Sequence, residues 1–220
     1  TDLCRKIESG LYTVVMTGSY DIRHEEAIFN VSLTLIASPY TVTYYTVAYS
    51  EIKNKFTTFY TYNTEQLENI GQQLISFKNG ELYLHNKTTN YNEFYGVDYP
   101  QKITIVGNKN PKFNKVFTNT AIRTNGEWNV PEMRILPTLN YPIGMKSRLK
   151  KNKFVNKEGV QYASFMNDMT DPRYATPTEA LINGRPLRGE CVEIDYQNES
   201  TDKCVTLMFT IGMTNSELGV

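Results

Sequence analysis

The side chains that most often carry catalysis or bind metal ions are few in this chain and widely spaced. It contains only two histidines, His24 and His85, which cannot supply an HExxH zinc site or a multi-histidine metal centre. His24 lies among charged residues in a predicted loop, and His85 lies opposite Leu74 on the polar side of a predicted hairpin. We interpret both as surface histidines, and we expect neither a metal ion nor a cofactor.

Three carboxylates, Glu190, Glu193 and Asp195, are the best candidates for acid–base chemistry, because a pair of carboxylates can hydrolyse a glycosidic bond. Glu193 and Asp195, however, alternate onto the outer face of a predicted strand whose other face is apolar, as in any half-exposed sheet. There is no GxSxG motif, and segment 107–115 lacks the Gly-Lys-Ser/Thr ending of a phosphate-binding loop. We therefore predict that the protein is not an enzyme, and a carboxylate hydrolase is a lesser hypothesis.

A positively charged run occupies residues 146–157, "KSRLKKNKFVNK". Its cations could contact phosphates, and Phe154 could stack on a base. Lys plus Arg total 23 against 23 Asp plus Glu, so the chain as a whole does not attract nucleic acid. A solvated loop or a salt-bridged contact between subunits explains the run better, although the same side chains could line a passage that DNA traverses. The cations are Lys146, Arg148, Lys150, Lys151, Lys153 and Lys157.

The cysteines, Cys4, Cys191 and Cys204, do not have a metal-binding spacing. If Tyr196 pairs with Lys203 in a terminal hairpin, the sulfur atoms of Cys191 and Cys204 lie on the order of 13 Å apart, which is too far for a disulfide. A different register of the loop would bring them together. We expect free thiols, which favour folding inside a cell.

The composition, with 16 Tyr and 10 Phe and abundant Thr and Asn, favours strands joined by tight turns. We predict a mainly β fold with a few short helices, in which antiparallel sheets form two small lobes. The lobes are expected to be sandwich-like or, from the strand–turn rhythm of residues 41–86, a partial propeller. The clearest predicted strands are 11–18, 28–37, 41–50, 55–62, 102–107, 115–124 and 132–137.

The segment 74–86, "LISFKNGELYLHN", predicts its own hairpin. Asn79-Gly80 fits a type I′ turn, whose two central residues both need a positive φ. One face of this hairpin is then wholly apolar, and the other is mostly polar. Pairing outward from the turn sets the register Lys78–Glu81, Phe77–Leu82, Ser76–Tyr83 and Ile75–Leu84.

Two short helices are predicted. Asn63 and Gly71 bracket the first, over residues 64–70. The second lies near 177–183, where "TPTEALING" combines an N-cap threonine, a proline at the first helical position and a closing glycine.

The polar stretch 85–101 has few apolar residues to bury and is the predicted boundary between the lobes. This boundary predicts an N-terminal antiparallel β lobe over residues 1–98 and a C-terminal β lobe over residues 99–220. The N-terminal lobe is expected to be part of a longer chain. The second core is predicted to centre on a terminal hairpin, in which Val192, Ile194 and Tyr196 share a face with Val205, Leu207, Phe209 and Ile211.

No stretch approaches the roughly 18–20 apolar residues that a membrane-spanning helix needs, so we expect no membrane span. The chain begins with Thr1 rather than Met. We expect that it is a fragment or a processed product of a longer protein.

Three phrases carry a family resemblance. They are "TVAYSEIKNKFTTFYTYNTEQLENIGQQLISFKNGELYLHN" (46–86), "KVFTNTAIRT" (115–124) and "INGRPLRGECVEIDY" (182–196). The chain resembles a family of virion proteins from crAss-like phages of gut bacteria, which are called tail or virion stabilisation proteins or muzzle proteins. The resemblance is to their C-terminal region. It rests on the order of the three phrases and covers most of residues 41–212.

The resemblance implies a structural component of the virion tail, folded and assembled in the cytoplasm of the bacterial host. Many copies would form a ring, expected to be a dodecamer, that closes or gates the distal end of the tail tube. The ring would dock on other tail proteins and could contact passing DNA without sequence specificity. The resemblance supplies no catalytic residue.

We nominate Arg185 and Arg188 of the "GRPLRG" turn as subunit contacts, together with Lys150, Lys151 and Lys153. The alternative is that the two arginines brace the turn against neighbouring carboxylates. Many members of the family that this chain resembles carry an Arg-and-aromatic phrase before the terminal helix. This chain departs from that pattern, since "MTDPRYATPTEA", with Arg173 and Tyr174, stands in its place.

A second functional hypothesis is a non-enzymatic module of the tail that binds host-surface glycans. It rests on Trp128 and on exposed Tyr and Asn side chains, which could stack on sugars and form hydrogen bonds with them.

Overall fold

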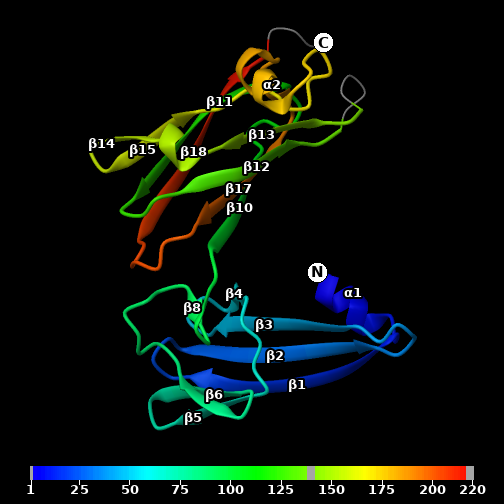
Figure 1. Ribbon diagram of the computed structural model, residues 1–220, viewed down its shortest axis with the longest axis vertical. Coiled ribbons are helices and arrows are strands. Elements are labelled where there is room, and N and C mark those ends of the chain that lie inside the picture. Colours follow the sequence, from blue (N-terminus) through cyan, green and yellow to red (C-terminus); the bar gives the residue numbers. More distant parts are fainter. Residues whose placement is uncertain (1, 138–141, 217–220) are drawn as a thin grey trace. The chain divides into compact units, whose positions relative to one another are not determined.

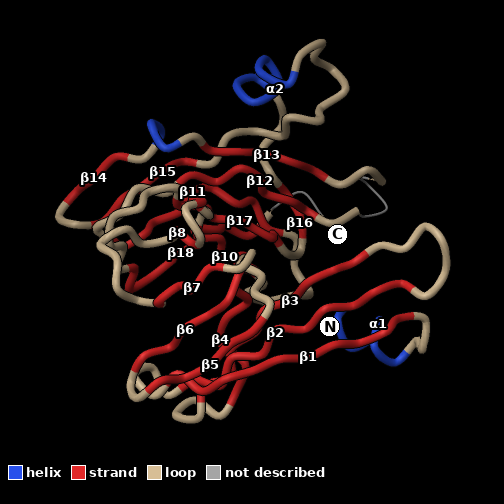
Figure 2. The backbone as a smooth tube through the Cα atoms, turned by 60° about the horizontal axis from the view of Figure 1, so that its bottom comes forward, coloured by secondary structure: helices blue, strands red, loops and turns tan. Residues whose placement is uncertain are grey.

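The computed structural model describes residues 2–137 and 142–216, and most of its regular structure is β-strand (Figures 1 and 2). These residues divide into two compact units. Unit 1 runs from the N-terminal helix to Thr89 and includes Glu93–Val97. Unit 2 comprises Asn90–Asn92 and the chain from Asp98 onward.

Unit 1 is built on a four-stranded antiparallel sheet in the order β1-β2-β3-β4 (Figure 1). Each strand pairs with the next one along the chain, so tight turns suffice to connect them. The strands are β1 (Tyr12–Asp21), β2 (Glu26–Leu35), β3 (Val42–Ser50) and β4 (Lys55–Tyr60), and the short helix α1 (Asp2–Glu8) precedes them.

A three-stranded antiparallel sheet, β5-β6-β7, completes the regular part of unit 1. Its strands are β5 (Gln66–Ile70), β6 (Gln73–Lys78) and β7 (Glu81–Leu84). The predicted hairpin is confirmed in every pair from Lys78–Glu81 to Ile75–Leu84. Asn79 and Gly80 have φ values of 52° and 78°, as a type I′ turn requires.

The predicted helix over 64–70 is wrong, because Gln66–Ile70 forms strand β5. This segment pairs with β6 from Gln66–Phe77 to Ile70–Gln73, and Leu67 enters the core with an exposure of 2%. A hairpin that supplies a ladder of backbone hydrogen bonds and an apolar contact outweighs the small helix preference of a seven-residue segment.

The core of unit 1 lies between its two sheets and contains Ile28, Ala48, Leu67 and Leu74. Leu67 and Leu74 are on the same face of the three-stranded sheet as Ser76, whose exposure is 0%. The apolar face that the hairpin pattern predicts is therefore not the one that meets the four-stranded sheet. Instead it carries exposed side chains such as Phe77 and Leu82.

Unit 2 contains two antiparallel sheets, which we call the β17 sheet and the β11 sheet. The β17 sheet has the order β10-β17-β12-β13, and β11 pairs with β15 and β16 on one side and with β18 on the other. The strands of the β17 sheet are β10 (Gln101–Gly107), β12 (Asn129–Ile135), β13 (Met145–Leu149) and β17 (Val192–Asn198). Those of the β11 sheet are β11 (Lys115–Thr124), β14 (Val155–Lys157), β15 (Val160–Ser164), β16 (Arg188–Gly189) and β18 (Thr206–Asn215).

One hydrophobic core joins the two sheets of unit 2, which makes this unit a β-sandwich. Every second residue of β17 is fully buried, namely the core residues Val192, Ile194 and Tyr196 and the polar Asn198. The ring of Tyr196 packs on Phe209 of β18 at 4.7 Å between centroids, and its hydroxyl lies 2.7 Å from Thr120 Oγ1 of β11.

The predicted terminal hairpin is wrong, although most of its apolar residues do enter the core. β18 pairs with β11 in the opposite sheet, and β17 lies between β10 and β12. Phe209 and Ile211 still pack against the same core as Ile194, now from across the sandwich, whereas Leu207 is 71% exposed. Cys191 and Cys204 are free thiols, as predicted. The predicted reason, their separation along a hairpin, does not apply because the hairpin does not form.

The remaining elements are short. The predicted helix near 177–183 is confirmed as α2 (Pro177–Asn183), and the Thr176 side chain accepts a hydrogen bond from the backbone N–H of Glu179. The 3₁₀ turn η1 (Lys151–Lys153) follows β13, and β8 (Glu93–Phe94) pairs with β9 (Val97–Asp98).

The predicted fold class is confirmed, since the described chain is strand-rich with a few short helices and several small antiparallel sheets. Of the two predicted architectures, unit 2 adopts the sandwich. Residues 41–86 do not form a propeller blade, because β3 and β4 belong to one sheet and β5–β7 to another.

The sandwich makes a prediction that distinguishes it from a terminal hairpin. Ile194→Ala should lower the free energy of unfolding by about 2–5 kcal/mol, because it empties a fully buried site. Leu207→Ala should change it by no more than about 0.5 kcal/mol, because that side chain is in solvent. Urea unfolding followed by the fluorescence of Trp128, the single tryptophan, measures both, and equal losses in the two variants would contradict the sandwich.

Candidate interaction surface

Two buried aspartates organise the loop that carries the nominated arginines. Asp168 and Asp171 have side-chain exposures of 0%, and neither lies in a helix or a strand. Asp168 Oδ1 accepts hydrogen bonds from the backbone N–H of Lys146 and from the backbone N–H and hydroxyl of Thr170. The Asp168 carboxylate therefore ties this loop to the start of β13.

Asp171 is surrounded by donors from two arginines. Arg173 Nη2 lies 2.7 Å from Asp171 Oδ2, and the backbone N–H of Arg185 donates to the same oxygen at 3.0 Å. The hydrogen bonds from Arg173 hold the pKa of Asp171 well below its usual range, and burial opposes this only in part. The carboxylate is thus held in its charged form.

Arg185 is bound within this cluster, as the bracing alternative predicted. Its Nε lies 3.3 Å from Asp168 Oδ2 and 3.9 Å from Asp171 Oδ2, and its carbonyl accepts the backbone N–H of Asp168. The Arg185 side chain keeps about a third of its surface in solvent. A contact with a neighbouring subunit stays a prediction, since these ion pairs leave part of Arg185 exposed.

Arg188 lies on β16 and is half-buried. Its backbone N–H points at Met145 Sδ, 3.4 Å away, and its Nε is buried without a hydrogen-bond partner among the described residues.

Tyr174 donates a hydrogen bond from its hydroxyl to the carbonyl of Asn183 at the end of α2. Arg173 lies 5.8 Å from the Tyr174 ring centroid, so these two residues form a cation–π pair.

The nominated lysines Lys150, Lys151 and Lys153 are exposed at the turn after β13. Lys151 forms a surface ion pair with Glu127 at 3.1 Å, and Lys146, at the start of the run, pairs with Glu132 at 2.7 Å. Lys150 and Lys153 form no ion pair with any residue that the structure describes. Two cations of this turn are therefore available to an acidic partner.

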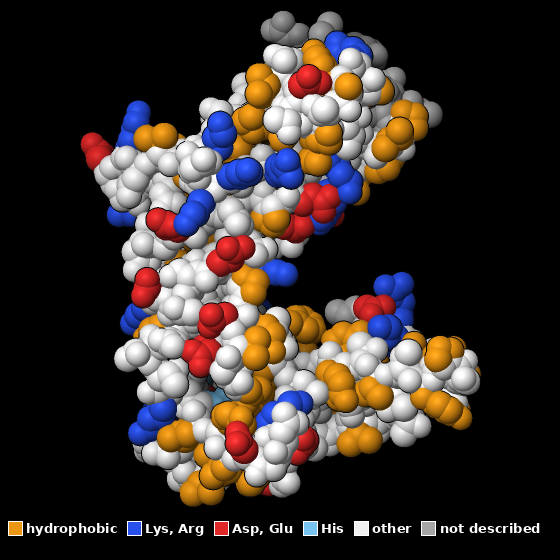
Figure 3. All heavy atoms as spheres, viewed as in Figure 1, with side chains coloured by type: hydrophobic (Ala, Val, Ile, Leu, Met, Phe, Trp, Pro, Cys, Tyr) orange, Lys and Arg blue, Asp and Glu red, His pale blue; other side chains and the backbone are white. Residues whose placement is uncertain are grey.

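The carboxylates of β17 are engaged in ion pairs rather than arranged for catalysis. Arg134 of β12 lies 2.6 Å from Asp195 and 3.2 Å from Glu193 on the outer face of the sheet. Burial raises the pKa of Asp195, but hydrogen bonds from Thr104 and Arg134 outweigh it and leave the pKa lowered. A general acid needs the opposite shift. Both acidic and basic side chains lie on the face of unit 2 seen in Figure 3.

Trp128 and His85 are less exposed than predicted. Trp128 is buried in the core of unit 2, and its Nε1 donates to Thr124 Oγ1 at 3.3 Å, so it cannot stack on a sugar. His85 is half-buried against Tyr62, Phe94 and Tyr95, and its Nε2 lies 2.7 Å from Ser76 Oγ. Burial lowers the pKa of His85. His24 is exposed as predicted.

Among residues 2–137 and 142–216, no cluster of three or more His, Cys, Asp or Glu side chains is arranged to hold a metal ion. None of the helices within those ranges has the length and apolar character needed to cross a membrane.

The lowered pKa of Asp171 predicts how its contribution to stability depends on pH. A depressed pKa stabilises the fold fully above the ordinary aspartate pKa of about 3.9, and the effect is lost as pH falls toward the folded-state value. The melting temperature of Asp171→Asn should therefore be several degrees below that of the wild type at neutral pH. The difference between the two melting temperatures should become smaller below about pH 4. Thermal melts from pH 7 to pH 3 measure this, with the exposed Asp98→Asn as control. A difference in melting temperature that grows as the pH falls would contradict this prediction.

Comparison with known families finds a match that lies mostly in unit 2. Residues 89–168 match the Crassvirus muzzle protein C-terminal domain, and no curated protein matches the chain. The match contains the predicted phrase 115–124 and the lysine run, whereas the phrases at 46–86 and 182–196 lie outside it. The resemblance to muzzle proteins of crAss-like phages is therefore confirmed over residues 89–168, which are similar to the Crassvirus muzzle protein C-terminal domain.

Proposed function

We propose that this chain is a non-enzymatic structural component of a crAss-like phage virion, part of a muzzle ring that closes or gates the distal end of the tail tube. The observation that carries the proposal is the family match over residues 89–168. That segment supplies β10–β15, which include strands of both sheets of the sandwich. The matched residues thus form part of one folded unit rather than a linker.

The charge arrangement of unit 2 supports a structural role. Two of the three candidate carboxylates, Glu193 and Asp195, are bound to Arg134. The buried aspartates are bound to arginines that anchor the loops before and after α2. Buried charges that are paired and hydrogen-bonded favour one arrangement of a loop, because any other arrangement leaves a charge uncompensated. Rigid loops of this kind suit a surface that must match a neighbouring subunit.

The proposed assembly is a ring, expected to be a dodecamer, that docks on other tail proteins. Its subunit contacts would include Lys150 and Lys153, which have no ion-pair partner among the described residues, and the exposed parts of Arg185 and Arg188. The same lysines could contact passing DNA through its phosphates without sequence specificity. The protein would fold in the bacterial cytoplasm before joining the virion.

The assembly state tests the proposed function. The purified chain should form a discrete high-order oligomer by mass photometry, and the same sequence should be found by mass spectrometry in purified phage particles. A protein that is monomeric at every concentration and absent from particles would contradict the proposal.

The lysine turn gives a sharper test of the subunit contact. Combined substitution of Lys150, Lys151 and Lys153 by alanine should leave the melting temperature nearly unchanged, because exposed substitutions change stability by no more than about 0.5 kcal/mol. The oligomer fraction in mass photometry should fall, since unpaired cations at a contact add electrostatic attraction. The matched control replaces three other exposed lysines of unit 2, Lys109, Lys112 and Lys203, and equal effects of the two triple variants would contradict a contact at this turn.

A further inference from the structure

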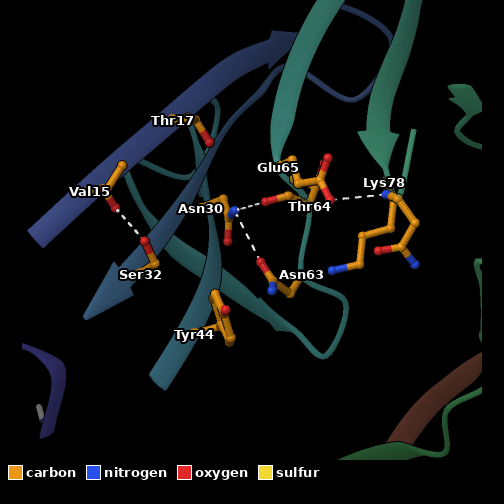
Figure 4. A pocket seen from close by; sticks show the side chains of 10 residues that line it. Val15, Thr17, Asn30, Ser32, Tyr44, Asn63, Thr64, Glu65 and Lys78 are labelled. Atoms are coloured by element: carbon orange, nitrogen blue, oxygen red, sulfur yellow. Dashed lines mark hydrogen bonds between the residues drawn. The ribbon is translucent and has the colours of Figure 1, made fainter. Parts of the chain in front are cut away.

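Unit 1 contains a polar groove beside the area where its two sheets meet (Figure 4). The groove has a volume of about 440 Å³. Its floor is one face of the four-stranded sheet, where Val15, Ser32 and Tyr44 form one cross-strand row and Thr17 and Asn30 the next. The wall is the β4–β5 connection, Asn63–Glu65, and the turn of the β6–β7 hairpin, Lys78-Asn79.

This face of the four-stranded sheet changes from apolar to mainly polar along its strands. The next row along the same face holds Ile28 and Ala48, which are buried under Leu67 and Leu74 of the three-stranded sheet. Beyond the edge of that cover, the floor consists of one amide, two hydroxyl side chains, a tyrosine and a single aliphatic residue, Val15. The groove is thus a built part of the surface and not a gap left by poor packing.

Four hydrogen bonds, of which one is buried and one exposed, fix the wall in place. Asn30 is 5% exposed, and its Nδ2 donates to Asn63 Oδ1 and to the carbonyl of Thr64. Thr64 Oγ1 lies 2.9 Å from the carbonyl of Phe77 on β6, and Glu65 Oε1 accepts the backbone N–H of Asn79 at 3.0 Å. A site held in this way loses little conformational entropy when a ligand binds.

Several polar groups of the groove are left over after these bonds. Because Asn63 Oδ1 is turned to Asn30, the Asn63 Nδ2 faces away and donates to no residue that the structure describes. Lys78 extends from the hairpin toward Asn63 (Figure 4) and forms no ion pair within the described chain. Tyr44, at 51% exposure, presents its ring at the other side of the groove.

We propose that this groove binds a carbohydrate. A sugar hydroxyl both donates and accepts, so it can pair with the ammonium of Lys78, the amide of Asn63 and the carboxylate of Glu65 at once. The exposed ring of Tyr44 offers a flat apolar surface for the C–H face of a pyranose, and its hydroxyl adds a polar contact. The inference uses only residues of unit 1 and is independent of whether unit 2 assembles into a ring.

Other occupants fit this lining less well. Glu65 would repel a phosphate or another anion placed beside Lys78. The apolar part of the lining is limited to Val15 and Tyr44, whereas the buried centre of a protein–protein interface is largely apolar. A sugar is the class of ligand that uses one aromatic ring and many small polar groups.

The test is binding of the purified chain to an array of neutral and acidic oligosaccharides, including fragments of bacterial surface polysaccharides. Oligosaccharides that bind are then titrated by calorimetry. Tyr44→Ala should weaken binding about tenfold, the effect of losing an aromatic contact of this kind, whereas Tyr44→Phe should keep most of it. Lys78→Ala should also weaken binding by several-fold and serves as a second variant if Tyr44→Ala does not fold.

Matched controls separate the groove from the rest of the surface. Tyr40→Ala and Lys55→Ala remove an exposed ring and an exposed cation of the same unit outside the groove, and both should bind like the wild type. The proposal is overturned if no oligosaccharide binds above background. It is also overturned if Tyr44→Ala and Lys78→Ala, folded by their thermal melts, bind as well as the two controls.

Discussion

The burial of one face of strand β17 is the interaction on which unit 2 depends. Its inward residues Val192, Ile194 and Tyr196 are fully enclosed, and its backbone pairs with β10 on one side and with β12 on the other. Tyr196 also reaches the opposite sheet through its hydroxyl contact with Thr120. β17 therefore joins neighbouring strands within one layer and holds the two layers together.

The family match is informative in the light of this arrangement. Residues 89–168 contain both strands that flank β17, but not β17 itself or β18. The matched segment has its inward side chains in a core that the following residues complete. The folded unit is thus larger than the matched segment, and the segment 165–187, which contains α2 and the aspartate–arginine cluster, belongs to the same unit.

Local chemistry made the β6–β7 hairpin predictable to the residue, because Asn79-Gly80 determines both the turn and the register. Helix α2 was predictable for the same reason, since its capping residues are adjacent in sequence. Residues 64–70 were mispredicted because their pairing with β6 and the burial of Leu67 outweigh a weak helix preference. Alternation identified the inward residues of β17 and most of those of β18, but it contains no information on which strand each one pairs with.

The candidate sites were less predictable than the fold. Arg185 is bound to Asp168 and Asp171, which lie in an irregular loop where no periodicity shows which side chains are buried. Trp128 was expected at the surface on the basis of its residue type, yet its indole N–H has a partner in Thr124, which allows it to be buried. The groove of unit 1 combines strands β1–β3 with a connection and a turn, and only the three-dimensional fold brings these together.

The order of strand pairing bears on how the chain folds as a ribosome synthesises it. In the two main sheets of unit 1, each strand pairs only with the strand immediately before or after it in the sequence. These pairs can therefore form while the chain is still being synthesised. Strand β10 instead pairs with β17, with Gln101 opposite Asn198. Until β17 has been synthesised, β10 and β12 lack the strand that lies between them. Their unpaired backbone edges are then the places at which nascent chains would aggregate.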